Sequence, residues 1–202
     1  MKKISFWSLA LCLGLMVFVF ADQQEEPVIG SEAPAFTLRC GGGGAHSLAD
    51  YRGKIVVLEW TNPGCPFVVR HYEKGLMPAL QKEAKEKGVV WLLINSTNPE
   101  HKDYKTQAEM KEIFGAWQAA AAKQFLDADG AVGKAYGAKT TPHLFVINAE
   151  GILVYSGAVD DDPRGENEER RVYLKEALEA LLSGNEIEVG STQPYGCTVK
   201  YQ

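Results

Sequence analysis

Cysteine and net positive charge are both scarce in this sequence, and each shortage excludes a class of protein. Four cysteines in 202 residues are too few to hold together a scaffold built on disulfides. The sequence has 21 basic residues against 26 acidic ones, and in no segment do lysine and arginine cluster into a basic stripe. A nucleic-acid partner is therefore not expected.

The first 21 residues have the pattern of a secretory signal peptide. Lys2 and Lys3 precede an apolar run from Phe6 to Phe20, and Ala21 offers a small residue for cleavage. A retained membrane anchor is the alternative, but the run is shorter than the about 20 apolar residues of a spanning helix. We expect cleavage after Ala21, no stable membrane anchor afterwards, and an exported protein that is periplasmic or secreted. Residues 22–29 then form a flexible lead-in, and residues 30–202 form one domain with a C-terminal tail at 186–202.

Cleavage leaves three cysteines, Cys40, Cys65 and Cys197. Disulfides persist in the oxidising compartments to which exported proteins go. Three is an odd number, so at least one thiol stays free unless it pairs with another molecule. We expect these cysteines to carry chemistry rather than to hold the fold.

Strands and helices alternate along the chain until a hairpin breaks the order. The expected strands are residues 35–38, 55–60, 89–95, 125–126, 143–148 and 152–157. The expected helices are residues 66–80, bent or split near Gly75 and Pro78, then 106–118, 132–136 and 168–183. This order predicts an α/β fold, with a central mixed β-sheet flanked by helices on both faces.

Cys65 stands where a buried strand ends and a helix begins. Pro66 suits the first position of a helix, where its missing N–H costs nothing. The unpaired N–H groups of a helix start favour a thiolate, and such sites lower a cysteine pKa to roughly 3.5–7.5. An inert cysteine that packs the helix start is the alternative. The loop that precedes Cys65 favours the reactive interpretation.

Thr141 and Pro142 come directly before the strand expected at 143–148. A proline at the first residue of a strand, after a turn, is a candidate for a cis peptide bond. An ordinary trans proline at a strand edge is the alternative. The strand, cysteine and helix upstream strengthen the cis prediction.

A family resemblance covers about residues 28–202. The residues that carry it are Gly30, Ala33, Pro34, Phe36 and Leu38, then Trp60, Thr61, Asn62, Cys65, Pro66, Phe67, Val68, His71 and Tyr72, and residues 136–143, 160–164 and 196–200. With them the chain resembles the thioredoxin-like superfamily, its redoxin branch of alkyl hydroperoxide reductase and peroxiredoxin relatives, and an exported peroxiredoxin-like subgroup. The resemblance implies a thioredoxin-like fold and a thiol-dependent oxidoreductase. It also implies that Cys65 reduces peroxides or protein disulfides with an external thiol reductant, without a cofactor or metal, at a site that includes Thr61, Thr141 and Pro142.

Two departures from these families limit the chemistry. Val68 fills the place of the second cysteine of a Cys-x-x-Cys pair, so no local disulfide can form. Asn62 stands where a standard peroxiredoxin has threonine, and Thr61 lies one residue further away.

Oxidised Cys65 therefore needs a thiol from elsewhere, and Cys197 is the best internal candidate. It lies in the aperiodic tail, whose mobility would let it reach the site, and Lys200 nearby would favour its thiolate. We expect a Cys65–Cys197 disulfide. A static tail cysteine or a permanent Cys40–Cys197 bridge is the alternative, since sequence does not fix connectivity. Cys40 is expected to be free.

A binding role competes with catalysis. A Cys65 and His143 metal pair is conceivable but has too few ligands. Residues 160–162, all aspartate, are expected to form a solvated loop rather than a calcium site. The missing Cys-x-x-Cys pair keeps open a non-catalytic thioredoxin-fold module that binds a partner or handles a metal.

Overall fold

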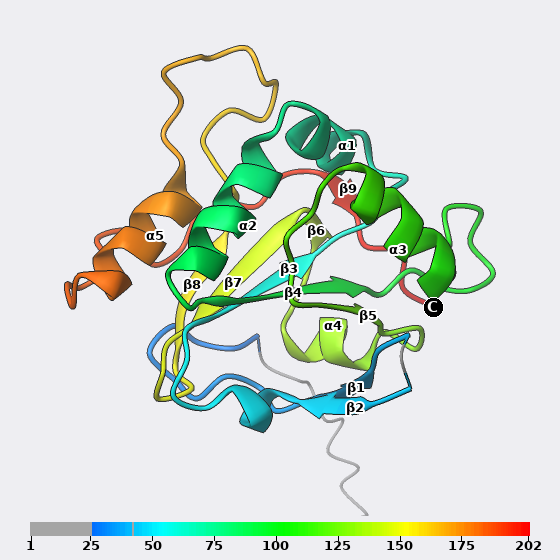
Figure 1. The fold of residues 1–202 in the computed structure, drawn as a ribbon, viewed down its shortest axis with the longest axis horizontal. Coiled ribbons are helices and arrows are strands. Elements are labelled where there is room, and N and C mark those ends of the chain that lie inside the picture. The colour runs from blue at the N-terminus through cyan, green and yellow to red at the C-terminus, as the bar shows by residue number, and fades with distance from the viewer. Residues whose placement is uncertain (1–25, 42) are drawn as a thin grey trace, which may run out of the picture.

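A five-stranded mixed sheet forms the centre of the molecule (Figure 1). The computed structural model describes residues 26–41 and 43–202, so the predicted signal peptide and residues 22–25 of the lead-in lie outside the described residues. In spatial order the strands are β5 (Lys123–Leu126), β4 (Val90–Asn95), β3 (Val56–Trp60), β7 (His143–Ile147) and β8 (Leu153–Gly157). Strands β3, β4 and β5 run parallel, whereas β7 and β8 pair antiparallel. The mixed sheet predicted from the sequence is confirmed.

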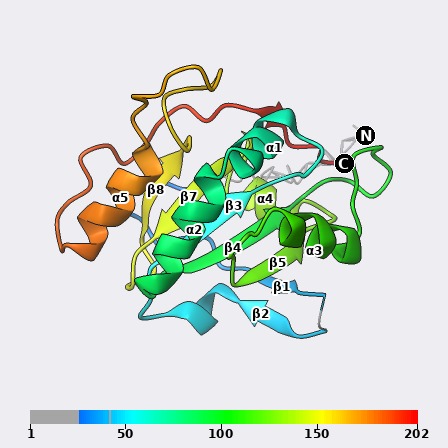
Figure 2. The same cartoon turned by 45° about the horizontal axis from the view of Figure 1, so that its top comes forward.

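Every residue of β3 is buried, because helices or loops cover both faces of the central strand. On one face, α1 (Pro66–Glu73), α2 (Leu76–Glu86), α3 (Gln107–Ala116) and α5 (Tyr173–Leu182) bury their apolar sides. On the other face lie α4 (Ala131–Ala135), the short hairpin β1 (Thr37–Arg39) with β2 (Ala45–Ser47), and the 3-10 turn η1 (Leu48–Tyr51). Figure 2 shows these two layers from a second direction. Helices cover both faces, as predicted.

The helix after Cys65 is split in two at the predicted place. Helix α1 ends at Glu73, and Gly75 takes a left-handed conformation with φ +79° as α2 begins. Glycine has no Cβ, so it adopts this conformation without steric strain. The split leaves α1 as a short helix that carries Cys65 at its start.

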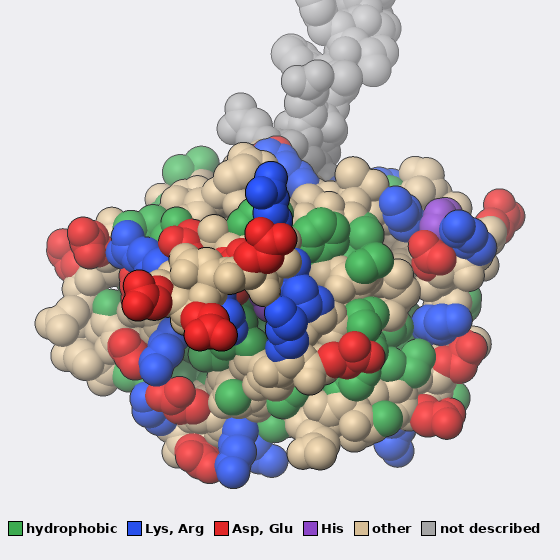
Figure 3. Space-filling model, turned by 90° about the horizontal axis from the view of Figure 1, so that it is seen from above, with side chains coloured by type: hydrophobic (Ala, Val, Ile, Leu, Met, Phe, Trp, Pro, Cys, Tyr) green, Lys and Arg blue, Asp and Glu red, His purple; other side chains and the backbone are tan. Residues whose placement is uncertain are grey.

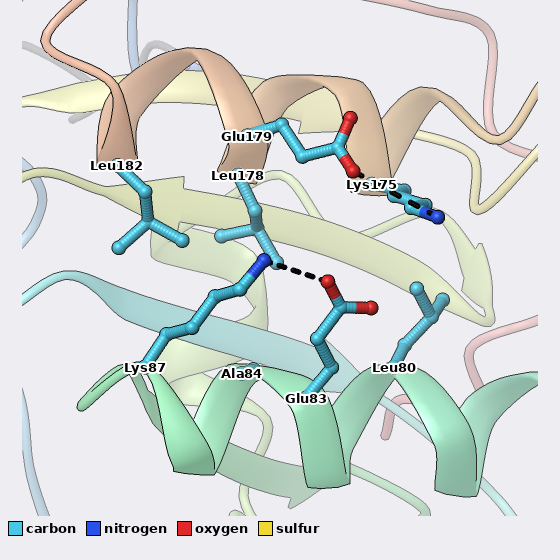
Figure 4. Close-up of a pocket in the computed structure, with 8 residues that line it drawn as sticks. All are labelled: Leu80, Glu83, Ala84, Lys87, Lys175, Leu178, Glu179 and Leu182. Carbon is cyan, nitrogen blue, oxygen red and sulfur yellow. Dashed lines mark hydrogen bonds and ion pairs between the residues drawn. The ribbon is translucent and has the colours of Figure 1, made fainter.

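Helices α2 and α5 lie side by side and close one edge of this layer (Figure 4). Leu80 and Leu178 point toward each other across the groove, above which each helix carries an ion pair of its own. The pairs join Lys87 to Glu83 at 2.7 Å and Lys175 to Glu179 at 3.7 Å. Exposed pairs of this kind contribute little stability, so burial of the apolar residues holds the two helices together.

Helix α5 starts at Tyr173, five residues later than predicted. The reason is the loop before it, which folds around two of its own carboxylates. Asp162 accepts the backbone N–H groups of Gly165, Glu166 and Asn167 at 2.8–3.1 Å, and Asp161 accepts that of Arg171 at 2.9 Å. These bonds hold the chain outside a helix. The expectation of a solvated acidic loop is also wrong for Asp160 and Asp162, which are both buried.

The C-terminal tail follows a defined path along the molecule. Figures 1 and 2 both show it running from α5 past the start of α1. Its short strand β9 (Cys197–Thr198) pairs antiparallel with β6 (Thr140–Thr141), outside the central sheet. Within the described residues, no helix has the length and apolar character needed to cross a membrane.

Candidate active site

Cys65 occupies the N-cap of α1, at the carboxyl end of β3, as predicted. Its carbonyl accepts the first helical hydrogen bond, from Val69 at 2.9 Å. Pro66 follows at the first helical position, where no N–H is needed. The side chain is buried, with 2% of the residue exposed. This geometry places the sulfur at the positive end of the helix.

Asn62 shapes the loop that brings Cys65 to this position. Its side-chain oxygen accepts the Gly64 N–H at 2.7 Å, and its amide donates to the Thr97 hydroxyl at 2.7 Å. Its carbonyl accepts the Cys65 N–H at 2.9 Å. An asparagine side chain that closes a turn in this way fixes the loop without help from a regular element. The residue that departs from the peroxiredoxin pattern is therefore a structural part of this loop.

The Thr141–Pro142 peptide bond is cis, as predicted, and it faces the cysteine. The Cys65 thiol donates to the Thr141 carbonyl, with a sulfur–oxygen distance of 2.9 Å. Both Thr141 and Cys65 are buried. The residue before the cis proline thus contacts the sulfur directly.

Cys197 lies against Cys65, which brings together two of the cysteines named from the sequence. Strand β9 pairs Cys197 with Thr141, the residue whose carbonyl accepts the Cys65 thiol, and the two cysteines are close enough for each to shift the pKa of the other. Gly196 makes this approach possible. A Cβ at Gly196 would stand 2.1 Å from the Thr141 carbonyl oxygen, and its φ of +143° suits glycine.

The two thiols have opposite pKa shifts. Burial raises the pKa of Cys65, but hydrogen bonds from the Thr141 and Cys197 side chains and from the Val68 backbone outweigh burial and hold it below the ordinary value. Burial, followed by the hydrogen bond and charge of Cys65, raises the pKa of Cys197 to about 11. Lys200 lowers the pKa of Cys197, in the direction expected from the sequence, but burial and Cys65 outweigh it. The two thiols therefore differ in acidity, with Cys65 the more acidic.

A cavity of about 240 Å³ opens beside the two cysteines. Besides Cys65 and Cys197, its lining includes Thr61, Asn62, Thr97, Lys102, Asp103, Thr141 and Lys200. Thr61 is 1% exposed, and its hydroxyl, near the Glu59 carboxylate, forms no hydrogen bond of good geometry among the described residues. The cavity thus offers a cysteine with a lowered pKa and charged side chains of both signs.

Cys40 and His143 are not part of this arrangement. Cys40 bridges Phe125 near the outer strand β5 and lines a different cavity. His143 accepts the Lys139 N–H at 3.2 Å with one ring nitrogen and contacts the Ser156 hydroxyl at 3.3 Å with the other. Both of its nitrogens are therefore engaged away from Cys65.

Within residues 26–41 and 43–202, no group of three or more His, Cys, Asp or Glu side chains is placed to hold a metal ion. All three cysteines in these ranges are free thiols.

A buried carboxylate on β3 escaped the sequence analysis. Glu59 receives hydrogen bonds from Tyr72 at 3.0 Å, Trp91 at 2.9 Å and Gln81 at 3.3 Å. Burial raises its pKa to about 7, although these donors lower it. Glu59 sits within an otherwise apolar run, and that single interruption was the only signal available in the sequence.

Comparisons with known proteins found a matching family model and similar solved structures. The family model described as Redoxin matches residues 29–173. A hypothetical protein from Sinorhizobium meliloti 1021 is 26% identical with a TM-score of 0.77, over 88% of this chain and 97% of that one. An uncharacterized conserved protein from Geobacillus kaustophilus is also 26% identical with a TM-score of 0.77, over 87% and 93%.

The thioredoxin domain of a thiol-disulfide oxidoreductase from Bacteroides vulgatus is 24% identical with a TM-score of 0.50, over 64% of this chain and 87% of that one. This likeness shows the thioredoxin-like fold, which the sequence predicted. The comparison with curated proteins found no match.

Proposed function

Since the chain belongs to the Redoxin family, we propose that it is a thiol-dependent oxidoreductase in which Cys65 attacks the substrate and Cys197 resolves the product. The observation that carries this proposal is the position of Cys197 beside Cys65 at one cavity, with the pKa of Cys65 lowered and that of Cys197 raised. A thiolate is the nucleophile in thiol chemistry, and a second thiol must follow it.

A hydroperoxide is the substrate that the closed site favours, in the manner of a peroxiredoxin-like protein. The Cys65 thiolate attacks one peroxide oxygen, the O–O bond breaks, and an alcohol or water leaves with a proton. The sulfenic acid at Cys65 is then attacked by Cys197, which forms the disulfide and releases water. An external dithiol returns both cysteines to thiols and is itself oxidised to a disulfide. The burial of Cys65 and the cavity of about 240 Å³ support a small oxidant.

A protein disulfide is a second candidate, and the pairing of β9 with β6 supports it. The tail presents a cysteine to Cys65 on an extended strand, and a client cysteine in an extended segment could take the same place. Cys65 would attack one client sulfur and release the other as a thiol. Cys197 would then displace the client from the mixed disulfide.

Hydrogen peroxide and an oxidised model protein separate the two substrates. Reduced protein is mixed with each, and the formation of the Cys65–Cys197 disulfide is followed by mass spectrometry. Cys197→Ser should stop the reaction at a sulfenic acid or a mixed disulfide, and Cys40→Ser is the matched control that should behave as the wild type. No loss of the Cys65 thiol with either oxidant would reject the proposal in favour of a non-catalytic module that binds a partner or a metal.

Export is part of the same proposal. Residues 1–21 would be removed as a signal peptide, and residues 30–202 would act as one domain in a periplasm or a secreted fraction. Mass spectrometry of protein isolated from a bacterial periplasm tests this. A chain that still starts at Met1 would contradict it.

A further inference from the structure

We propose that Tyr195 is a positioning residue that clamps the tail to helix α1 and thereby sets how often Cys197 meets Cys65. This inference rests on the proposed function, because it assigns the device that keeps the resolving thiol in place.

Backbone hydrogen bonds to other segments hold the tail before and after Tyr195, but not at Tyr195 itself. Before it, Thr192 donates its N–H to the Ser156 carbonyl at 3.1 Å. After it, strand β9 pairs with β6, and the Val199 N–H bonds the Lys139 carbonyl at 3.1 Å. Within the described chain, residues 193–196 make no backbone hydrogen bond to another segment. The side chain of Tyr195 therefore has to anchor this stretch, which leads directly into Cys197.

The Tyr195 hydroxyl sits between two groups that come from different elements. It donates to the carboxylate of Asp160, in the loop after β8, and lies 2.9 Å from the His71 ring nitrogen Nε2 on α1. Since the phenol donates to the carboxylate, the histidine nitrogen donates to the phenol oxygen. Burial, followed by Arg70 and Arg170, lowers the pKa of His71 to about 4, so the ring is neutral near pH 7. This leaves one N–H on Nε2 for that bond.

Asp160 is a strong anchor for the phenol. It is 1% exposed, and Arg170 approaches its other oxygen at 3.2 Å. A hydrogen bond to a buried, ionised acceptor contributes more than one between neutral groups. Removal of the phenol would leave that carboxylate oxygen with the Asp162 N–H, at 3.2 Å, as its remaining hydrogen-bond donor.

The ring of Tyr195 ties the same residue to the helix that carries the nucleophile. It packs on Phe67 with ring centroids 5.9 Å apart and on His71 at 6.0 Å. Both partners lie on α1, whose N-cap is Cys65. The clamp thus fixes the tail relative to Cys65 itself, and not merely to the body of the protein.

The consequence concerns the effective concentration of one thiol at the other. Strand β9 has only two residues, so its own pairing gives weak hold on Cys197. A side-chain clamp two residues away limits the freedom of the tail. It therefore raises the effective concentration of the Cys197 thiol at Cys65.

The test is the equilibrium between the reduced protein and its Cys65–Cys197 disulfide in mixtures of reduced and oxidised glutathione. One oxidised glutathione takes two electrons and two protons from the cysteine pair and becomes two reduced molecules. Acid quenching, alkylation and mass spectrometry give the disulfide fraction. Tyr195→Phe keeps the ring and removes only the hydroxyl, and it should lower the equilibrium constant about tenfold, the effect of one hydrogen bond to a charged group.

Two further variants sharpen the result. Tyr173→Phe, whose ring lies against Arg171, is the matched control and should stay within about twofold of the wild type. Asp160→Asn keeps an acceptor but loses the charge, and it should lower the constant by a smaller factor, about threefold. A constant unchanged in both Tyr195→Phe and Asp160→Asn would overturn the inference.

A second measurement distinguishes a clamp on the tail from a general disturbance of the Cys65 site. It is the rate at which iodoacetamide alkylates Cys65 in the Cys197→Ser background. Tyr195→Phe should not lower that rate, because the clamp acts on the tail and a looser tail leaves Cys65 at least as accessible. An equal loss in the rate and in the equilibrium constant would overturn the inference. A wild-type protein that forms no Cys65–Cys197 disulfide at any glutathione ratio would instead reject the proposed function, and the clamp with it.

Discussion

The two sulfur atoms at the site differ in how they hold a proton, and this difference can be titrated. Cys65 has a pKa below its ordinary value and Cys197 one raised to about 11. In a Cys40→Ser background, alkylation by iodoacetamide against pH should rise in two steps, one below about 8.5 and one near the upper value. Peptide mapping assigns each step to its cysteine. A single step near 8.5 for both thiols would contradict the geometry of the site.

The buried carboxylate of Glu59 makes the stability of the fold depend on pH. Its pKa is raised to about 7 in the folded protein, from 4.5 without the fold. The folded state therefore binds the proton more tightly, and stability falls as the pH rises from about 4.5 to 7, by roughly 3 kcal/mol. Below 4.5 and above 7 this contribution is constant.

Urea denaturation of the wild type and of Glu59→Gln measures this effect. The amide cannot ionise, so the free energy of unfolding of the variant should lack the fall between pH 4.5 and 7. Parallel curves for the two proteins would show that Glu59 does not titrate in that range.

At the scale of elements, the contact between β9 and β6 depends on one glycine. Gly196→Ala would push a methyl group into the Thr141 carbonyl. We expect the tail to leave β6 and Cys65 to become accessible, so that a bulky aromatic disulfide reagent reacts about tenfold faster with Cys65. Gly184→Ala is the control, because Gly184 also has a positive φ but no atom lies within 4 Å of its added Cβ. Equal rates in both variants would show that strain alone, and not the close approach, governs access.

The sequence was sufficient for the elements whose signals are local. The buried run of β3, the proline after Cys65 and the glycine between α1 and α2 each have a direct physical effect on their own segment. The cis bond at Pro142 was also predictable, from its place before a strand.

The elements that the sequence missed are held by partners far away in the chain. Strands β6 and β9 have two residues each and exist only because the tail reaches Thr141. The loop before α5 stays non-helical because Asp161 and Asp162 bind its backbone. Asp160 is buried by Tyr195 and Arg170, which no local pattern reveals. The position of Cys197 was proposed from chemistry, but the way it is held had to come from the structure.

At the scale of the whole molecule, oxidation should stabilise the fold. A Cys65–Cys197 bond would close a loop of more than 100 residues, and chain-entropy models assign such loops roughly 4–5 kcal/mol. For a protein of this size, the melting temperature of the oxidised form should be about 10 °C above that of the reduced form. Calorimetry with and without a reductant measures the difference. In Cys197→Ser the difference should vanish, and its persistence there would assign the stabilisation to Cys40.

Charged side chains of both signs are mixed on one face of the molecule. Figure 3 views the molecule from above the orientation of Figure 1, and acidic and basic side chains alternate on that face. Pairs such as Arg171 with Glu176 at 2.7 Å are exposed and contribute little. Salt should therefore change the melting temperature far less than the state of the two thiols does.

The pairing of β6 with β9 also has a consequence for how each new molecule is made. A ribosome releases Cys65 well before Cys197, and at typical rates the delay is on the order of ten seconds. During that interval, the nascent chain exposes Cys65 without the strand that shields it in the complete fold. Newly made chains are therefore the population most open to capture by passing oxidants, glutathione or other thiols. Synthesis in a reducing environment, followed by transfer of the finished chain, would avoid that loss.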